Sequence, residues 1–188
     1  MARKLITYRE RFFSNSTAMA VELSINGFFI ELAKVKGKNQ AGDNIYDWDN
    51  ARKISPEAWE ISTLYEGLLI YRNGGPEEYK KKVRSLSVSS QYPDGNPKYT
   101  NVQFVHEHEG KVRRFGWALN SSNKLQFIIY DKDNMFYPIQ TPDMDKLIHY
   151  LEFIIKLSFH YRGLLLEDKR LEAIKAKKEK ERDLGYGK

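Results

Sequence analysis

The chain has 188 residues, which is enough for one compact domain with a full core or for two very small domains. Its 41% hydrophobic and 30% charged residues exclude a disordered chain, and no apolar stretch approaches the roughly 18 residues that a membrane-spanning helix needs. The absence of cysteine excludes disulfides, thiolate metal sites and cysteine nucleophiles, while the net charge of +6 favours a polyanionic partner.

The first part of the chain, Leu5–Ser55, has the pattern of β-strands. Ser16–Ile25 and Phe28–Lys36 are predicted to form an antiparallel pair, because Asn26-Gly27 between them is a strong hairpin signal that needs positive φ at both positions. After a loop over 37–44, a further extended stretch is predicted to begin at Ile45-Tyr46-Asp47-Trp48.

A helix is predicted next, with Ser55 as its N-cap, Pro56 in the first helical position and Glu57 in the first turn. Helical spacing then places one apolar face on Trp59, Ile61, Leu64, Tyr65 and Leu68.

The Gly74-Gly75-Pro76 sequence predicts a break, after which a second strand-rich half begins. Its predicted strands are Val83–Ser89, Tyr99–His106, Lys111–Asn120, Leu125–Tyr130 and the short Phe136–Gln140. The turns between these strands are predicted at 93–97, 109–110, 121–123 and 133–134.

The second half closes with Thr141-Pro142-Asp143, which again reads as a cap, a proline and an acid at the start of a helix. Apolar residues nearly encircle this helix over Met144–Leu157, so we expect it to pack against copies of itself in an oligomer. The similar start of both helices indicates either an internal duplication or simply a common way to begin a helix.

These elements predict an α+β fold of two β-sheet-plus-helix halves, with antiparallel sheets packed on two helices. The expected organisation is one domain over 1–166, with halves of about 1–75 and 76–166, and a charged tail over 167–188. The tail is expected to be a fraying helix, or alternatively an arm that touches nucleic acid or a neighbouring protomer.

Catalytic and cofactor motifs are absent from the sequence, which has no nucleophile elbow, no phosphate-binding loop and no dinucleotide fingerprint. We therefore expect neither an enzyme nor a cofactor. The exception to weigh is His106-Glu107-His108-Glu109, where two imidazoles on one strand face could bind a metal as in a metal-dependent nuclease. No third ligand is indicated, so no metal site is predicted.

Basic and aromatic residues alternate along several predicted strands. Arg9, Arg11 and Phe13 should share one strand face, and Lys111, Arg113 and Arg114 lead toward Phe115 and Trp117. Such an arrangement suits phosphate contacts combined with base stacking, whereas lysines at strand ends also serve to protect sheet edges. Several clusters of this kind in one chain favour nucleic-acid binding.

Three further stretches resemble the Whirly family of single-stranded-DNA-binding proteins. The first is Ile45-Tyr46-Asp47-Trp48, which resembles the family's Tyr-Asp-Trp strand. The second is Phe13–Glu22, which lies where that family has a Lys-Gly-Lys-Ala-Ala-Leu-x-Val motif. The third comprises Asn123-Lys124-Leu125 and the following Met135–Ile139, which come in the family's order. In addition, Lys53–Trp59 is similar to the Pro-Glu-x-Trp helix entry of the related positive-cofactor transcriptional coactivators. The likeness spans about Leu5 to Gly163.

The resemblance implies outward-facing sheets over internal helices, a homotetramer, and single strands bound with little sequence preference. Ser14 and Ser16 stand at the two motif lysines, so hydroxyls would replace charges there. The predicted nucleic-acid-binding residues are Arg9, Arg11, Phe13, Ser14, Ser16, Lys34, Lys36, Tyr46, Trp48, Arg84, Lys111, Arg113, Arg114 and Lys124.

The expected function is therefore single-stranded DNA binding in replication, recombination or repair. RNA binding by the same fold, as in the similar mitochondrial guide-RNA-binding proteins, and a structural oligomer without nucleic acid are the alternatives. Because no apolar signal core follows the basic start of the chain, we expect a cytoplasmic or nucleoid-associated protein, in the host cytoplasm if it is viral. No membrane partner is expected.

Overall fold

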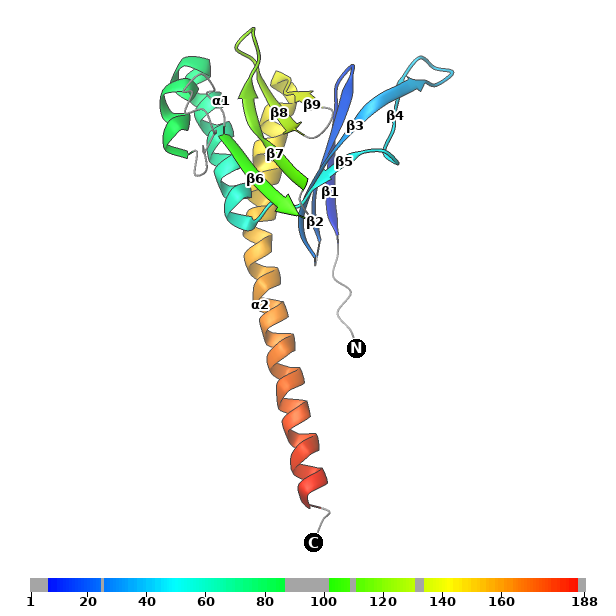
Figure 1. Ribbon diagram of the computed structural model, residues 1–188, viewed down its shortest axis with the longest axis vertical. Coiled ribbons are helices and arrows are strands. Elements are labelled where there is room, and N and C mark those ends of the chain that lie inside the picture. The colour runs from blue at the N-terminus through cyan, green and yellow to red at the C-terminus, as the bar shows by residue number, and fades with distance from the viewer. Residues whose placement is uncertain (1–6, 25, 87–101, 109–110, 131–133, 186–188) are drawn as a thin grey trace.

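The computed structural model describes residues 7–24, 26–86, 102–108, 111–130 and 134–185. Within these ranges the chain forms five strands and a helix, followed by four strands and a second helix (Figure 1). Both sheets are antiparallel, so the predicted α+β class with two sheet-plus-helix halves is confirmed.

The first sheet is built around its longest strand, β3. Its strands are β1 (Tyr8–Phe13), β2 (Thr17–Ser24), β3 (Gly27–Lys38), β4 (Asn44–Tyr46) and β5 (Arg52–Ile54). The order is β1-β2-β3, and β4 and β5 pair with successive parts of the free side of β3. Strand β1 therefore lies at the edge of this sheet.

The β2–β3 turn lies one residue earlier than predicted, because Ser24 pairs with Gly27, which is already the first residue of β3. Gly27 has a positive φ of 113°, as predicted for this position. The glycine is used where the chain enters β3, in a conformation that residues with a Cβ rarely adopt.

Helix α1 (Ala58–Leu86) begins later than predicted. Its first intrahelical bond runs from the Ile61 N–H to the Glu57 carbonyl, which makes Glu57 the N-cap residue. The Glu60 carboxylate accepts a bond from the Glu57 N–H at 2.7 Å, as in a capping box. Ser55 instead donates its hydroxyl to the Phe28 carbonyl and ties the helix entry to β3.

The Gly74-Gly75-Pro76 break lies inside α1 as a kink and does not separate a helix from strands. Gly75 has φ of 69° and ψ of −169°, and helix resumes from Pro76. The predicted strand Val83–Ser89 is therefore wrong over residues 83–86, which are helical; 87–89 lie outside the described residues. Val83 is buried because Tyr79 and Val83, one helical turn apart, both point into the core.

The second sheet follows chain order, β6-β7-β8-β9. Its strands are β6 (Val102–His108), β7 (Lys111–Leu119), β8 (Leu125–Tyr130) and β9 (Met135–Pro138), close to the predicted ranges. The predicted turn at 121–123 is confirmed, with Asn123 at φ of 59°. The predicted turns at 93–97 and 109–110 lie outside the described residues, as does residue 133 of the predicted turn at 133–134.

Helix α2 (Thr141–Gly185) starts after Gln140, whose carbonyl accepts the Met144 N–H, so Gln140 and not Thr141 is the cap. Proline precedes the cap of α1 but follows the cap of α2, so the two similar sequences begin their helices differently. The helix continues without a break across the expected 166/167 boundary and extends far beyond the sheets (Figure 1).

One core joins the inner faces of both sheets to the two helices. Its largest buried side chains include Phe12 and Met19 of the first sheet, Phe115, Trp117 and Phe127 of the second, and Leu64 and Leu151 of the helices. The Trp117 Nε1–H donates to the Leu64 carbonyl at 2.7 Å, which fixes α1 on the second sheet. None of the described helices combines the length and apolarity that crossing a membrane would require.

Candidate nucleic-acid interface

Strand β1 presents an alternation of inward and outward side chains at the sheet edge. Phe12 is 1% exposed, whereas Arg9, Arg11 and Phe13 lie on the opposite, solvent-exposed face, as predicted from their spacing. Directly across from Arg11 and Phe13 on β2 are Ala20 and Ala18. These short side chains leave room for the long ones to lie over the sheet.

Two aromatic residues from beyond β3 complete this surface. The guanidinium carbons of Arg9 and Arg11 lie 5.4 Å and 5.1 Å from the centre of the Trp48 ring, within cation–π range. The Tyr46 ring lies 5.3 Å from the Phe13 ring, and its hydroxyl donates to the Ser14 carbonyl at 2.6 Å. We call these five residues, Arg9, Arg11, Phe13, Tyr46 and Trp48, the aromatic–arginine stripe.

The two arginines of the stripe differ in their electrostatic surroundings. Arg9 donates to Glu22 at 3.2 Å and to Glu31 at 2.5 Å, and Lys53 also pairs with Glu31 at 3.1 Å. Arg11 has no carboxylate partner for its guanidinium within the described ranges. The charge of Arg9 is therefore compensated inside the protein, whereas the charge of Arg11 remains available to a ligand.

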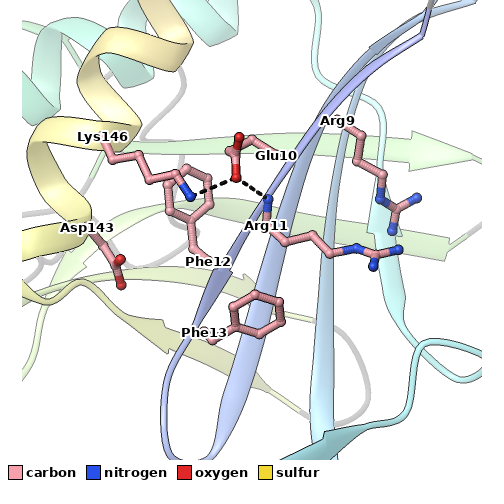
Figure 2. A pocket seen from close by; sticks show the side chains of 7 residues that line it. All are labelled: Arg9, Glu10, Arg11, Phe12, Phe13, Asp143 and Lys146. Carbon is pink, nitrogen blue, oxygen red and sulfur yellow. Dashed lines mark hydrogen bonds and ion pairs between the residues drawn. The ribbon is translucent and has the colours of Figure 1, made fainter.

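A hollow of about 590 Å³ runs along the edge of β1. Figure 2 shows that β1 forms one side and the first turns of α2, with Asp143 and Lys146, form the other. The Lys146 ammonium bonds the Glu10 carboxylate at 2.7 Å, and the Arg11 N–H donates to the same oxygen (Figure 2). The hydrogen bond from Lys146 lowers the pKa of Glu10, so this carboxylate remains charged and covers part of the open strand edge.

A second hollow, of about 570 Å³, adjoins the first, and the Phe13 ring borders both. It lies between the β1–β2 turn, the β3–β4 loop and the residue before α2. Its lining residues are Phe13, Ser14, Asn15, Lys38, Gly42, Asp43, Asn44, Tyr46 and Gln140. Phe13 lines both hollows, so they adjoin at this residue, and we call the two hollows together the recess.

Ser14 and Ser16, at the positions of the motif lysines, belong to the β1–β2 turn. Ser14 is 6% exposed, and its hydroxyl donates to the Thr17 carbonyl and accepts the Thr17 N–H. Its hydrogen-bonding capacity is therefore used to shape the turn. Ser16 is exposed, and its carbonyl accepts the Val35 N–H from β3.

The remaining predicted residues do not join the stripe. Lys34 pairs with Thr17 in the β2–β3 register, which puts Lys34 on the face opposite Arg9. Lys36 lies at the irregularity of β3 between Val35 and Gly37. Lys124 lies in the β7–β8 turn, whose Asn123 carbonyl accepts the Tyr71 hydroxyl of α1. Arg84 is in α1 and not in a strand.

The basic cluster of β7 is divided between the two faces of its sheet. Arg113 lies on the same face of β7 as the buried rings of Phe115 and Trp117, and it donates to the Lys53 carbonyl at 3.1 Å. Arg114 faces the other way, opposite Val105 and Tyr130. The two rings therefore fill the core and are not available for stacking, contrary to the expectation for this strand.

His106, which the sequence marked as a metal candidate, contacts a buried carboxylate. Its Nε2 lies 2.9 Å from the carboxylate of Glu60, which is 3% exposed. This contact joins β6 to the first turn of α1. Among the residues that the structure describes, no three potential ligands gather at a metal site.

Sequence patterns missed Glu10, Lys38, Asp43 and Lys146, which line the recess. Glu10 has the inward alternation of β1, and Lys146 lies on a helix at the other end of the chain, so only the tertiary fold brings them together. Lys38 and Asp43 flank a short loop, and the sole available signal was its Asn-rich, Gly-containing composition.

Comparison with known proteins gives little further information. No protein-family model and no curated protein matches this chain. A solved structure described as the plant transcriptional regulator PBF-2 is similar, with a TM-score of 0.47 and 13% sequence identity, over 85% of this chain and 86% of that chain.

Proposed function

We propose that this protein binds single-stranded DNA with little sequence preference and acts in replication, recombination or repair. The observation that carries the proposal is the aromatic–arginine stripe, which places cations and rings side by side on one exposed face of the first sheet. Phe13 is 50% exposed, so its ring is accessible to a ligand.

Each part of the recess suits one part of a single strand. Arg11 carries a positive charge that can pair with a phosphate, and the Phe13 ring offers a face on which a base can stack. Trp48, held beside both arginines, extends the same platform. A duplex stacks its bases internally, so a surface that relies on stacking favours single strands.

The same proposal includes self-association, as a homotetramer, and no catalytic step or cofactor. Exposed apolar side chains along α2, among them Phe153 and Phe159, support the oligomer. Phosphate pairing and stacking do not require a particular sugar, so RNA is included in the test.

The test measures fluorescence anisotropy of labelled oligonucleotides of equal length, as single-stranded DNA, double-stranded DNA and single-stranded RNA, over a salt series. We expect the single strand to bind more tightly than the duplex, and log affinity to fall linearly with log salt by about 0.7 per phosphate contacted. Phe13→Ala should cost roughly 1–3 kcal/mol with little change of slope, since stacking is uncharged.

Lys80→Ala provides the control, because Lys80 lies on α1 and pairs with Glu77 away from the recess. It should leave both affinity and slope unchanged. Affinity that does not depend on salt, or equal affinity for duplex and single strand, would contradict the proposal. Tighter binding of RNA than of DNA would show that RNA is the preferred ligand.

A further inference from the structure

The β3–β4 loop holds the Asp43 carboxylate in a fixed orientation at the second hollow. The Asn39 side chain accepts the Asp43 N–H at 2.8 Å and donates its amide to the Asp43 carboxylate at 3.0 Å. The Asn39 N–H closes the loop on the Asp43 carbonyl at 2.9 Å, and Gly42 adopts a φ of 88°. Three hydrogen bonds to Asn39 and the conformation of Gly42 thus hold Asp43 in place within one short loop.

A cation borders the same hollow. Lys38 ends β3, and neither it nor Asp43 forms an ion pair in the described part of the chain. A carboxylate with one contact from Asn39 retains most of its acceptor capacity. The Asp43 carboxylate can therefore accept hydrogen bonds from a ligand, and the Lys38 ammonium can donate to an acceptor atom beside those donors.

From this arrangement we propose that the second hollow accepts one unstacked nucleobase and prefers guanine. The Watson–Crick edge of guanine places the N1–H and N2–H₂ donors beside the O6 acceptor. The donors suit the Asp43 carboxylate, O6 suits the Lys38 ammonium, and the half-exposed Phe13 ring supplies a stacking surface.

The other bases fit less well for chemical reasons. Thymine offers two carbonyl oxygens and one N–H, so at least one oxygen would face the carboxylate. Adenine and cytosine each provide one amino group beside an unprotonated ring nitrogen, which gives the carboxylate a single donor group. This inference rests on the proposed single-strand binding and adds a base preference at one position of the recess.

The test compares the full-length protein on dT-only oligonucleotides with the same oligonucleotides carrying one central dG, dA, dC or deoxyinosine. Each probe carries only one dG, so it cannot form the structures that guanine-rich strands adopt. We expect dG to raise affinity about tenfold over dT, and inosine, which lacks the 2-amino group, to lose most of that gain. The probe comparison uses unaltered protein, so it does not depend on any variant folding.

Asp43→Asn should reduce the dG to dT affinity ratio to near one, because the carboxylate is lost. Asp49→Asn is the matched control, since Asp49 is exposed and lies outside both hollows, and it should keep the ratio of the unaltered protein. Equal affinity for the dG and dT probes would overturn the guanine pocket while single-strand binding stands. Failure of every single-stranded probe to bind would overturn both.

Discussion

Arg9 and Arg11 illustrate how neighbours decide the role of a residue. Both project from the same face of β1, and both lie over Trp48. Arg9, however, bridges Glu22 and Glu31, whose side chains are only 16% and 13% exposed. The positive charge of Arg9 therefore compensates the negative charges of these two carboxylates, whereas the charge of Arg11 remains available to a phosphate.

Separate alanine variants should therefore have different effects. Arg11→Ala should lower the salt slope of single-strand affinity by about 0.7, the value of one phosphate contact, with little change in stability. Arg9→Ala should reduce the free energy of unfolding by about 1–2 kcal/mol, because the partly buried Glu22 loses its arginine partner and Glu31 keeps only Lys53. Urea denaturation and the salt series measure the two effects. Equal loss of stability in both variants would contradict this division of roles.

The sequence could indicate the shared face of Arg9, Arg11 and Phe13, because a period of two is a local property of a strand. It could not indicate the partners of Arg9, which lie 13 and 22 residues away on other strands. The same limit applies to Ser14, whose hydroxyl was predicted to contact a phosphate. In the structure this hydroxyl is buried and bonds Thr17 within the β1–β2 turn. Phosphate contacts inferred from residue type alone therefore included residues that the fold uses elsewhere.

At the scale of elements, strands were easier to predict than the boundaries of helices. Four strands of the second half lie close to their predicted ranges, since alternation and turn residues mark them locally. Val83–Ser89 was predicted as a strand because Gly74-Gly75-Pro76 was interpreted as a break. In the structure the same residues only bend α1, since Gly75 can adopt a conformation closed to other residues and Pro76 is tolerated in a first helical turn.

This kink gives a prediction with a built-in control. Gly75→Ala should lower the free energy of unfolding by about 1–3 kcal/mol, because a Cβ is strained at φ of 69° and ψ of −169°. Gly163 lies inside α2 with open space around its Cβ position, so Gly163→Ala should raise stability by up to about 1 kcal/mol. Thermal and urea denaturation measure both variants. A stability gain in Gly75→Ala would show that the kink is not required.

At the scale of the molecule, the recess depends on elements from opposite ends of the chain. Its floor and one side come from β1, its other side from the first turns of α2, and its far end from the β3–β4 loop. Thr17 donates to the Phe136 carbonyl at 2.7 Å, which ties the first sheet to β9 beside that end. Sequence could predict the composition of this surface but not the hollows, because their shape depends on how the two halves dock.

The exposed side of α2 leads to the last prediction, which concerns assembly. Leu147, Leu151 and Ile154 point into the protein's own core, so they account for only part of the apolar surface of this helix. Three large apolar side chains of α2 remain exposed: Phe153 at 45%, Phe159 at 66% and Ile174 at 42%. In Figure 1 the helix extends well beyond both sheets. Large apolar side chains spaced along a protruding helix are typical of a surface that another chain covers.

We therefore expect light scattering at micromolar concentration to give a tetramer of the 22.1 kDa chain. Phe159→Glu should shift the mass toward the monomer, because a carboxylate at the most exposed ring would be buried without a partner in the interface. His160→Glu, the next and likewise exposed position, introduces the same group outside the apolar positions and should keep the assembly. A monomeric unaltered protein, or an unchanged assembly in Phe159→Glu, would show that α2 does not join the copies through this ring.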